Sequence, residues 1–178
     1  DQKIEIDWIP FSQPNLSAKY GGIFFPGPDL NEYSFHRSFH GHDTYSLVGI
    51  THTTASHGVM SSLKQIETSS LMPWDAIICT SKSVLDTVNK VINSNRENNK
   101  EKNITTSNIL PKFPIIPLGI DNNEFNFSEN EKIQARKKLN ISNDDIVLIF
   151  VGRLSFHAKA HHLPMYLALE KFSKKLKK

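Results

Sequence analysis

Short runs of apolar residues, each followed by a helical pattern, constrain the fold of this chain more than any other feature. The runs span residues 45–51, 74–80 and 146–151. Strands that are this continuously apolar are typical of parallel sheets, whose two faces are both covered. The pattern also indicates helices over about 59–68, from Ser81 onward, and over 129–139 with Ser128 as the cap. The alternation predicts an α/β protein with a Rossmann-like, doubly wound parallel sheet.

The remaining segments are less regular. Alternating apolar residues over 3–9 predict a strand, the run 113–116 predicts another, and a helix is expected from about 162 to the end. Residues 10–45 are rich in Gly, Pro, His and aromatic residues, with a helix expected around 31–39. Residues 93–108 are dense in polar side chains, as in a solvated insertion or a helix extension. Because the chain starts without methionine and stops inside a helical pattern, we expect an internal piece of a longer protein.

Charge and cysteine content favour a cytoplasmic protein that does not bind nucleic acid. The 21 Lys and Arg residues nearly balance 18 Asp and Glu residues, and much of the excess lies in the last few lysines. A surface for polyanions is therefore weakly supported. The one cysteine, Cys79, excludes an intramolecular disulfide and is expected to be a small buried side chain. No apolar run approaches the ~18 residues that span a bilayer.

Polar residues and glycines follow the predicted strands at their carboxyl ends, where ligands bind in sheets of this kind. His52, with two threonines behind it, follows the first apolar run. The other positions are Thr80, Ser81, Gly119 to Asp121, Gly152, Arg153 and Ser155. The clustering predicts a binding site along this edge.

Gly152 and Arg153, together with Lys159, form the strongest candidate within that site. A glycine that leaves a strand lets the backbone approach a ligand, and a following helix start offers N–H groups to an anion. Arg153 and Lys159 add two cations, which suit a diphosphate. Taken alone, the pair is more typical of solvated surface charges.

The other candidates also have simpler interpretations. Five of the eight histidines lie between His36 and His57, and His40, His42, Asp43 and His52 could hold a metal, although their spacing matches no established ligand pattern. His52 could instead be a core histidine bonded to a backbone carbonyl. Gly119 and Asp121 are expected to form a turn, in which the glycine allows a positive φ and the carboxylate can cap the local backbone.

Taken in order, three segments resemble the retaining glycosyltransferases of family four (group 1), which have the GT-B fold. The segments are 74–81 (WDAIICTS), 115–121 (IIPLGID) and 150–155 (FVGRLS) with Lys159, and the resemblance covers about residues 45–178. It departs from the family pattern at Leu118 and Ala160. The resemblance implies an incomplete two-domain architecture: residues 1–120 as part of the acceptor-side domain, and 121–178 as the linker and start of the nucleotide-sugar domain.

The resemblance further implies transfer of a sugar from a nucleotide-diphosphate sugar donor with retention at the anomeric carbon, without a metal or other cofactor. His52 matches the catalytic histidine beside the transferred sugar, while Gly152, Arg153, Ser155 and Lys159 match the donor site. Gly119 and Asp121 match the interdomain turn. The acceptor is left undefined (a glycan, a lipid or a small molecule), and a peripheral membrane contact is left open. The fragment alone is expected to be inactive.

Two other classes of function stay open at this point. One is a non-catalytic α/β module that binds a nucleotide or phosphate through the same basic residues. The other is a histidine-rich metal hydrolase. In the parent sequence, an acidic pair about a hundred residues beyond Lys178, as in the usual layout of the family, would favour the transferase over the module. Stoichiometric zinc or iron in the purified protein would favour the hydrolase.

Overall fold

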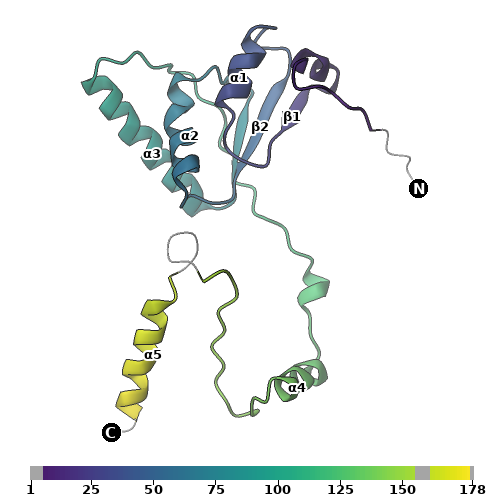
Figure 1. Ribbon diagram of the computed structural model, residues 1–178, viewed down its shortest axis with the longest axis vertical. Helices are drawn as coiled ribbons and strands as arrows, with labels where there is room; N and C mark the ends of the chain where they lie inside the picture. The colour runs from purple at the N-terminus through teal and green to yellow at the C-terminus, as the bar shows by residue number, and fades with distance from the viewer. Residues whose placement is uncertain (1–5, 155–160, 177–178) are drawn as a thin grey trace. The chain divides into compact units, whose positions relative to one another are not determined.

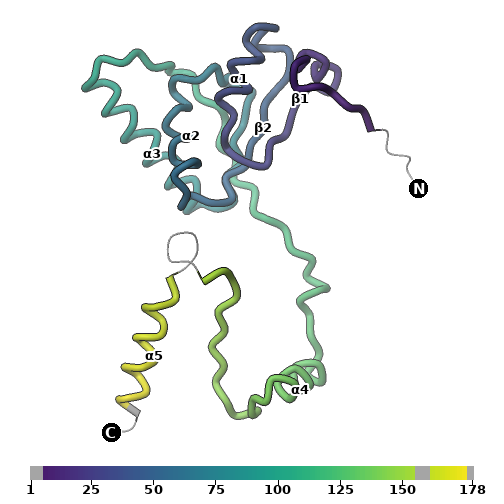
Figure 2. Tube along the Cα trace, viewed as in Figure 1, coloured from purple at the N-terminus to yellow at the C-terminus, as the bar shows by residue number. Residues whose placement is uncertain are grey.

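The computed structural model describes residues 6–154 and 161–176 of the chain (Figure 1). The chain divides into two compact units, unit 1 (Asp1–Pro117) and unit 2 (Leu118–Lys178). The Cα trace in Figure 2 follows each unit along the chain.

Unit 1 is a mixed α/β structure built on a three-stranded parallel sheet. The strands are β1 (Gly22–Phe24), β2 (Ser46–Thr51) and β3 (Ala76–Cys79), and they lie in the order β1-β2-β3. Helix α1 (Asn31–Ser38) connects β1 to β2, α2 (His57–Gln65) connects β2 to β3, and α3 (Lys82–Glu101) follows β3. Short 3₁₀ helices span Pro14–Tyr20 (η1) and Ile66–Thr68 (η2). The predicted strands 45–51 and 74–80 are therefore confirmed, as are helices near 31–39 and 59–68.

One hydrophobic core lies between the sheet and the helices. Leu47, Ile77 and Cys79 point from the strands into this core, where α2 and α3 add apolar side chains such as Leu63 and Val88. All five are fully buried. Alternate strand residues face the other way and are only half-buried. In the described part of unit 1, the core joins all three helices to a single face of the sheet.

The segment 112–116 runs beside β3 without becoming a regular strand. Backbone bonds join Lys112 to Asp75 and Ile77, and Ile116 N donates to Cys79 O at 3.0 Å. Pro114 lies between these two bonded positions and has no N–H to donate to β3. The ladder between β3 and the segment 112–116 is therefore interrupted, and only two isolated bridges form. The predicted strand 113–116 is correct in position but wrong as a continuous strand.

A buried ion pair fixes the amino ends of the strands. Arg37 of α1 and Asp75, just before β3, are both 0% exposed and are joined by two bonds of 2.6 and 2.7 Å. The Arg37 guanidinium also donates to Tyr45 O, and the Asp75 carboxylate accepts from Leu47 N. A planar fork that meets both carboxylate oxygens in this way fixes α1 against two strands.

Unit 2 contains helices but no strand among its described residues. The helices are η3 (Asn122–Phe125), α4 (Glu129–Lys138) and α5 (Leu163–Leu176). Ser128 caps α4 in a capping box with Glu131, as the sequence predicts. The predicted strand 146–151 is wrong: no partner strand is present in the described part of this unit, and Ile146 and Ile149 are 92% and 77% exposed.

One further expectation needs correction. Residues 6–9 of the predicted first strand form no strand, and residues 3–5 lie outside the described residues. For the polar stretch 93–108, the helix extension is confirmed over its first part, because α3 continues to Glu101. Asn95 and Arg96 hold this end of α3 to Lys64 O and to the buried Glu67 carboxylate.

Candidate functional site

The carboxyl ends of the three strands of unit 1 meet at one edge of the sheet. Thr51 of β2 pairs with Cys79 of β3, so the residues that follow them lie side by side. The Thr80 hydroxyl donates to Thr51 O at 3.2 Å across this edge. On the other side, Ile50 N donates to Gly27 O at 3.2 Å, which brings in the segment after β1. The edge is thus a continuous polar rim.

His52 lies on this rim as an exposed side chain. It follows β2 directly, as the sequence predicts. The alternative of a core histidine is wrong, because the imidazole is not enclosed by the core. An exposed ring at the carboxyl edge is free to contact a ligand and to exchange protons with it.

Two helices begin at the same rim, each with a serine cap. Ser56 accepts from Val59 N at 3.4 Å at the start of α2, and Ser81 accepts from Val84 N at 3.2 Å at the start of α3. Helix amino ends carry partial positive charge and favour anionic groups nearby. The rim therefore combines an imidazole, hydroxyls and two helix starts, which suits a polar or anionic substrate.

Thr51 is a feature of this edge that the sequence did not single out. Its side chain is fully buried, and its hydroxyl has no hydrogen-bond partner within the described residues. Buried hydroxyls without a partner are uncommon in folded proteins. No sequence signal distinguishes Thr51 from an ordinary strand threonine, because the burial arises from the packing of α2 and α3 over β2.

Gly119 and Asp121 lie in unit 2 and are exposed. The Asp121 carboxylate accepts from Asn123 N at 2.9 Å and caps η3, which confirms the expected local cap. Gly119 does not adopt the positive φ that glycine allows, whereas Gly152 does. A Cβ at Gly119 would meet no atom within 4 Å, so the backbone there does not require glycine.

Gly152 and Arg153 are the described members of the predicted diphosphate site. Gly152 has a φ of 154°, a value that favours glycine, and the Arg153 side chain is exposed. The other two members, Ser155 and Lys159, lie outside the described residues. The structure therefore shows an accessible guanidinium next to a glycine, while the proposed convergence of four residues stays a prediction.

The histidines of unit 1 are dispersed. Within residues 6–154 and 161–176, no three His, Cys, Asp or Glu side chains are grouped as metal ligands. His36 lies 4.0 Å from the Glu32 carboxylate, one helical turn away on α1.

Cys79 is fully buried, and burial raises the pKa of its thiol, as expected for a core residue rather than a nucleophile.

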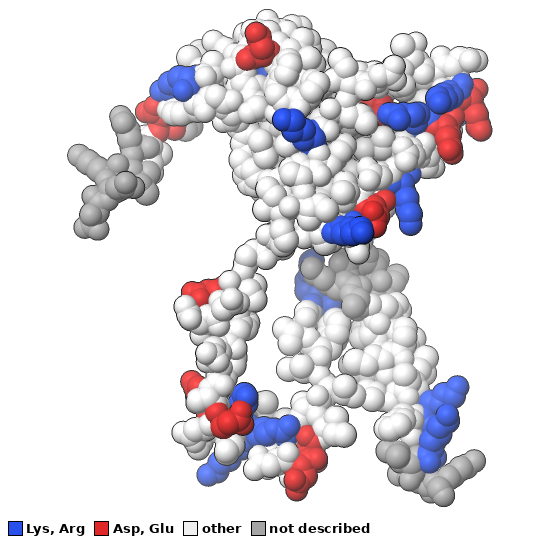
Figure 3. All heavy atoms as spheres, turned by 180° about the vertical axis from the view of Figure 1, so that it is seen from behind, with Lys and Arg blue, Asp and Glu red and all other residues white. Residues whose placement is uncertain are grey.

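Surface charge on unit 1 is mixed. On the face shown in Figure 3, basic and acidic side chains lie close to one another, separated by uncharged surface. A continuous basic stripe, which binding to nucleic acid requires, does not appear on the described part of that face.

None of the described helices has the length and apolar character required to cross a membrane.

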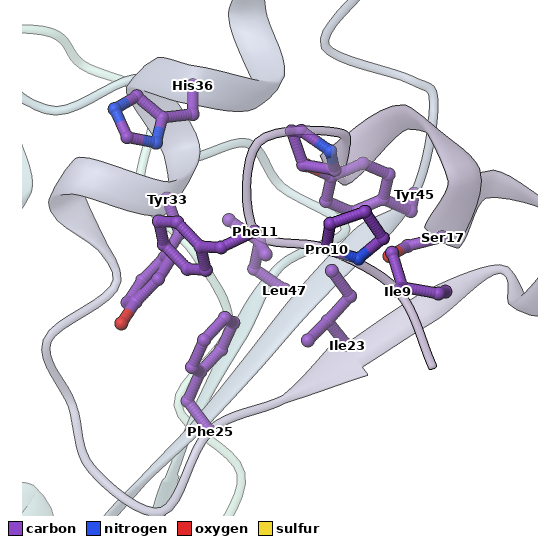
Figure 4. Close-up of a pocket in the computed structure, with 11 residues that line it drawn as sticks. Ile9, Pro10, Phe11, Ser17, Ile23, Phe25, Tyr33, His36, Tyr45 and Leu47 are labelled. Carbon is purple, nitrogen blue, oxygen red and sulfur yellow. The ribbon is translucent and has the colours of Figure 1, made fainter. Parts of the chain in front are cut away.

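A cavity beside β1 is the second feature that the sequence did not single out (Figure 4). It lies on the helix side of the sheet, between α1 and the segment that leads into η1. Its walls include Ile23 of β1 and Tyr33 of α1. The residues that line it are far apart in sequence, which explains why no motif indicated it.

No protein-family model, curated protein or solved structure matches this chain.

Proposed function

We propose that this chain is part of a retaining glycosyltransferase that transfers a sugar from a nucleotide-diphosphate sugar to an acceptor still to be identified. The observation that carries the proposal is the exposed His52 at the carboxyl edge of a parallel α/β sheet. The resemblance of residues 74–81, 115–121 and 150–155 to family four supports it. The Rossmann-like, two-domain GT-B architecture belongs to the proposal, with unit 1 as part of the acceptor-side domain.

The chemistry assigns different roles to the two units. In the donor, the bond between the anomeric carbon and the diphosphate oxygen breaks, and its electron pair stays on the diphosphate. Arg153, with Lys159, stabilises the charge that builds up there more than it stabilises the bound donor, which lowers the barrier. The acceptor hydroxyl forms the new bond to the anomeric carbon on the same face and passes its proton to the departing diphosphate oxygen. His52 contacts the transferred sugar and orients it.

Calorimetric titration of the complete polypeptide with UDP-, GDP- and ADP-sugars tests the donor site. We expect one of these donors to bind. Arg153→Ala should weaken the affinity for that donor by about 10- to 100-fold, because it removes one charge-assisted hydrogen-bonded contact. Lys138→Ala at the end of α4 is the matched control, because this exposed cation lies outside the proposed site. Failure of all three donor classes to bind contradicts the proposal.

His52→Ala separates an enzyme from the alternative, a non-catalytic α/β module that binds a nucleotide or phosphate. In a transferase, we expect this change to lower turnover of the complete protein about 100-fold or more while donor affinity changes little. In a module, the change has no turnover to affect. Release of nucleoside diphosphate in the presence of acceptor mixtures provides the measurement, and wild-type protein without release favours the module.

A further inference from the structure

The cavity beside β1 has a volume of about 250 Å³ and lies wholly within the described part of unit 1 (Figure 4). Its walls come from the segment 9–17, from β1 and the residue after it, from α1 and from the start of β2. It is distinct from the rim that carries His52, since Tyr45 and Leu47 line it from the amino end of β2. Its lining is predominantly apolar.

Aromatic rings form one side of the cavity. The rings of Phe25 and Tyr33 are stacked with their centroids 3.9 Å apart. The Phe11 ring meets Tyr33 edge-on at 5.5 Å and 78°. Flat rings gain further energy from stacked and edge-to-face contacts beyond the burial of their surface. A wall of this kind therefore favours a planar ligand over a flexible chain.

Two hydroxyl side chains line the same cavity and make no hydrogen bond within the described residues. Ser17 is 7% exposed and Tyr45 is 3% exposed, and both contribute to the lining. Neither hydroxyl bonds to any described residue of the chain. Figure 4 shows Ser17 and Tyr45 on the side of the cavity away from Tyr33 and Phe25. Because both hydroxyls line the cavity and are not used within the chain, they can bond to a polar group of a ligand there.

We propose that this cavity binds a small, neutral aromatic molecule of one or two rings that carries an O–H or N–H group. A cavity of about 150 Å³ is known to hold benzene, so the larger volume admits a second fused ring or a substituent. The ring packs against Tyr33, and its polar group bonds to Ser17 and Tyr45. Neutral ligands are favoured because the lining is predominantly apolar, and a charge without a partner is costly to bury there. The site is independent of the proposed transferase function.

Fluorine NMR of 5-fluoroindole with the full chain tests this proposal. We expect a dissociation constant on the order of 0.1–1 mM, as suits a ligand of about ten non-hydrogen atoms. Unlabelled indole and phenol should displace the probe, and cyclohexanol should compete far less. Tyr45→Phe, which keeps the ring and removes the hydroxyl, should weaken binding about 3- to 10-fold. Tyr166→Phe on α5 is the matched control and should leave binding unchanged.

Three results would contradict the proposed binding site. They are the absence of binding at millimolar probe, unchanged binding in both Tyr45→Phe and Ser17→Ala, and competition by cyclohexanol equal to that by indole and phenol. Circular dichroism and thermal melting establish that each variant is folded. If Tyr45→Phe does not fold, Ser17→Ala carries the test alone, because Ser17 lies on the short η1 and its truncation leaves the sheet intact.

Discussion

Unit 1 and unit 2 contain similar apolar segments but use them differently. Ile77, in the run 74–80 of unit 1, is 0% exposed, whereas Ile149, in the run 146–151 of unit 2, is 77% exposed. The first run pairs with β2 and lies under α2 and α3, while the second has no strand beside it in the described residues. No described residue of unit 2 is buried. An apolar run becomes a strand only where a neighbouring strand and a helical layer are available.

This difference also affects how each unit supports its own proposed site residue. His52 is held by a sheet with a core beneath it, so its position is fixed by packing. Arg153 follows the unpaired run 146–151 and has no such support among the described residues. The donor-binding half of the proposed enzyme therefore depends on pairing partners for that run, and the rim of unit 1 does not.

The largest expected effect comes from breaking the buried ion pair of unit 1. Asp75→Ala leaves the Arg37 guanidinium buried without a counter-charge and removes the acceptor of Leu47 N. We expect the free energy of unfolding of unit 1 to fall by about 3–5 kcal/mol, measured by urea titration with circular dichroism. Lys132→Ala, which breaks the exposed pair with Glu129 on α4, should cause no measurable change. Equal losses in both variants would contradict the contrast between the units.

A matched pair of isoleucine truncations tests the core directly. Ile77→Ala removes buried methyl groups of β3 and should lower the free energy of unfolding by about 2–5 kcal/mol. Ile149→Ala removes a side chain that is already exposed and should change it by less than about 0.5 kcal/mol. A loss above about 1 kcal/mol for Ile149→Ala would show that unit 2 has a core of its own.

Loss of a helix cap should have a smaller effect that also differs between the units. Ser81→Ala removes the acceptor of Val84 N at the start of α3 and should cost about 1 kcal/mol in the unfolding of unit 1. Ser128→Ala removes the equivalent bond of α4 and should reduce only the local helix content of residues 129–138. Carbon chemical shifts report the second change, and a shift in the unfolding midpoint of unit 1 for Ser128→Ala would be inconsistent with separate units.

The smallest expected effect is a pH dependence of α4. Hydrogen bonds from the Ser128 side chain and backbone lower the pKa of Glu131 below its ordinary value of 4.5. A lowered folded-state pKa stabilises the capping box above pH 4.5, and this stabilisation is lost as the pH falls through the lower, folded value. The helix content of residues 129–138 should therefore decrease below about pH 4.5. Glu131→Gln should abolish this pH dependence of the helix content. The same decrease of helix content with pH in the variant and the wild type would contradict the role of Glu131.

Local signals predicted much of unit 1. The apolar runs at 45–51 and 74–80 and the cap at Ser81 depend on neighbouring residues in the chain, so sequence is sufficient to place them. Strand β1 was not predicted, because it is only three residues long and begins at Gly22. Pro114 was visible in the sequence, but its effect depends on which carbonyl of β3 it faces.

The candidate site was predictable only in part, because some of its features depend on contacts between residues distant in the sequence. His52 was placed correctly because every strand of a parallel sheet ends at the same edge. Ser17 and Tyr45 could not be linked, because the pairing of β1 with β2 and the position of η1 bring them to one cavity. Strand formation at 146–151 also depends on residues distant in sequence, which is why a correct local propensity gave a wrong prediction there.

Amide hydrogen exchange on the full chain tests the contrast between the two units most directly. The account predicts slow exchange at Ile77 and Cys79, whose N–H groups donate to the carbonyls of Lys112 and Pro114. It predicts fast exchange throughout residues 146–151, which form no strand. Protection of 146–151 equal to that of β3 would contradict the account, because it would show that this run is already part of a sheet.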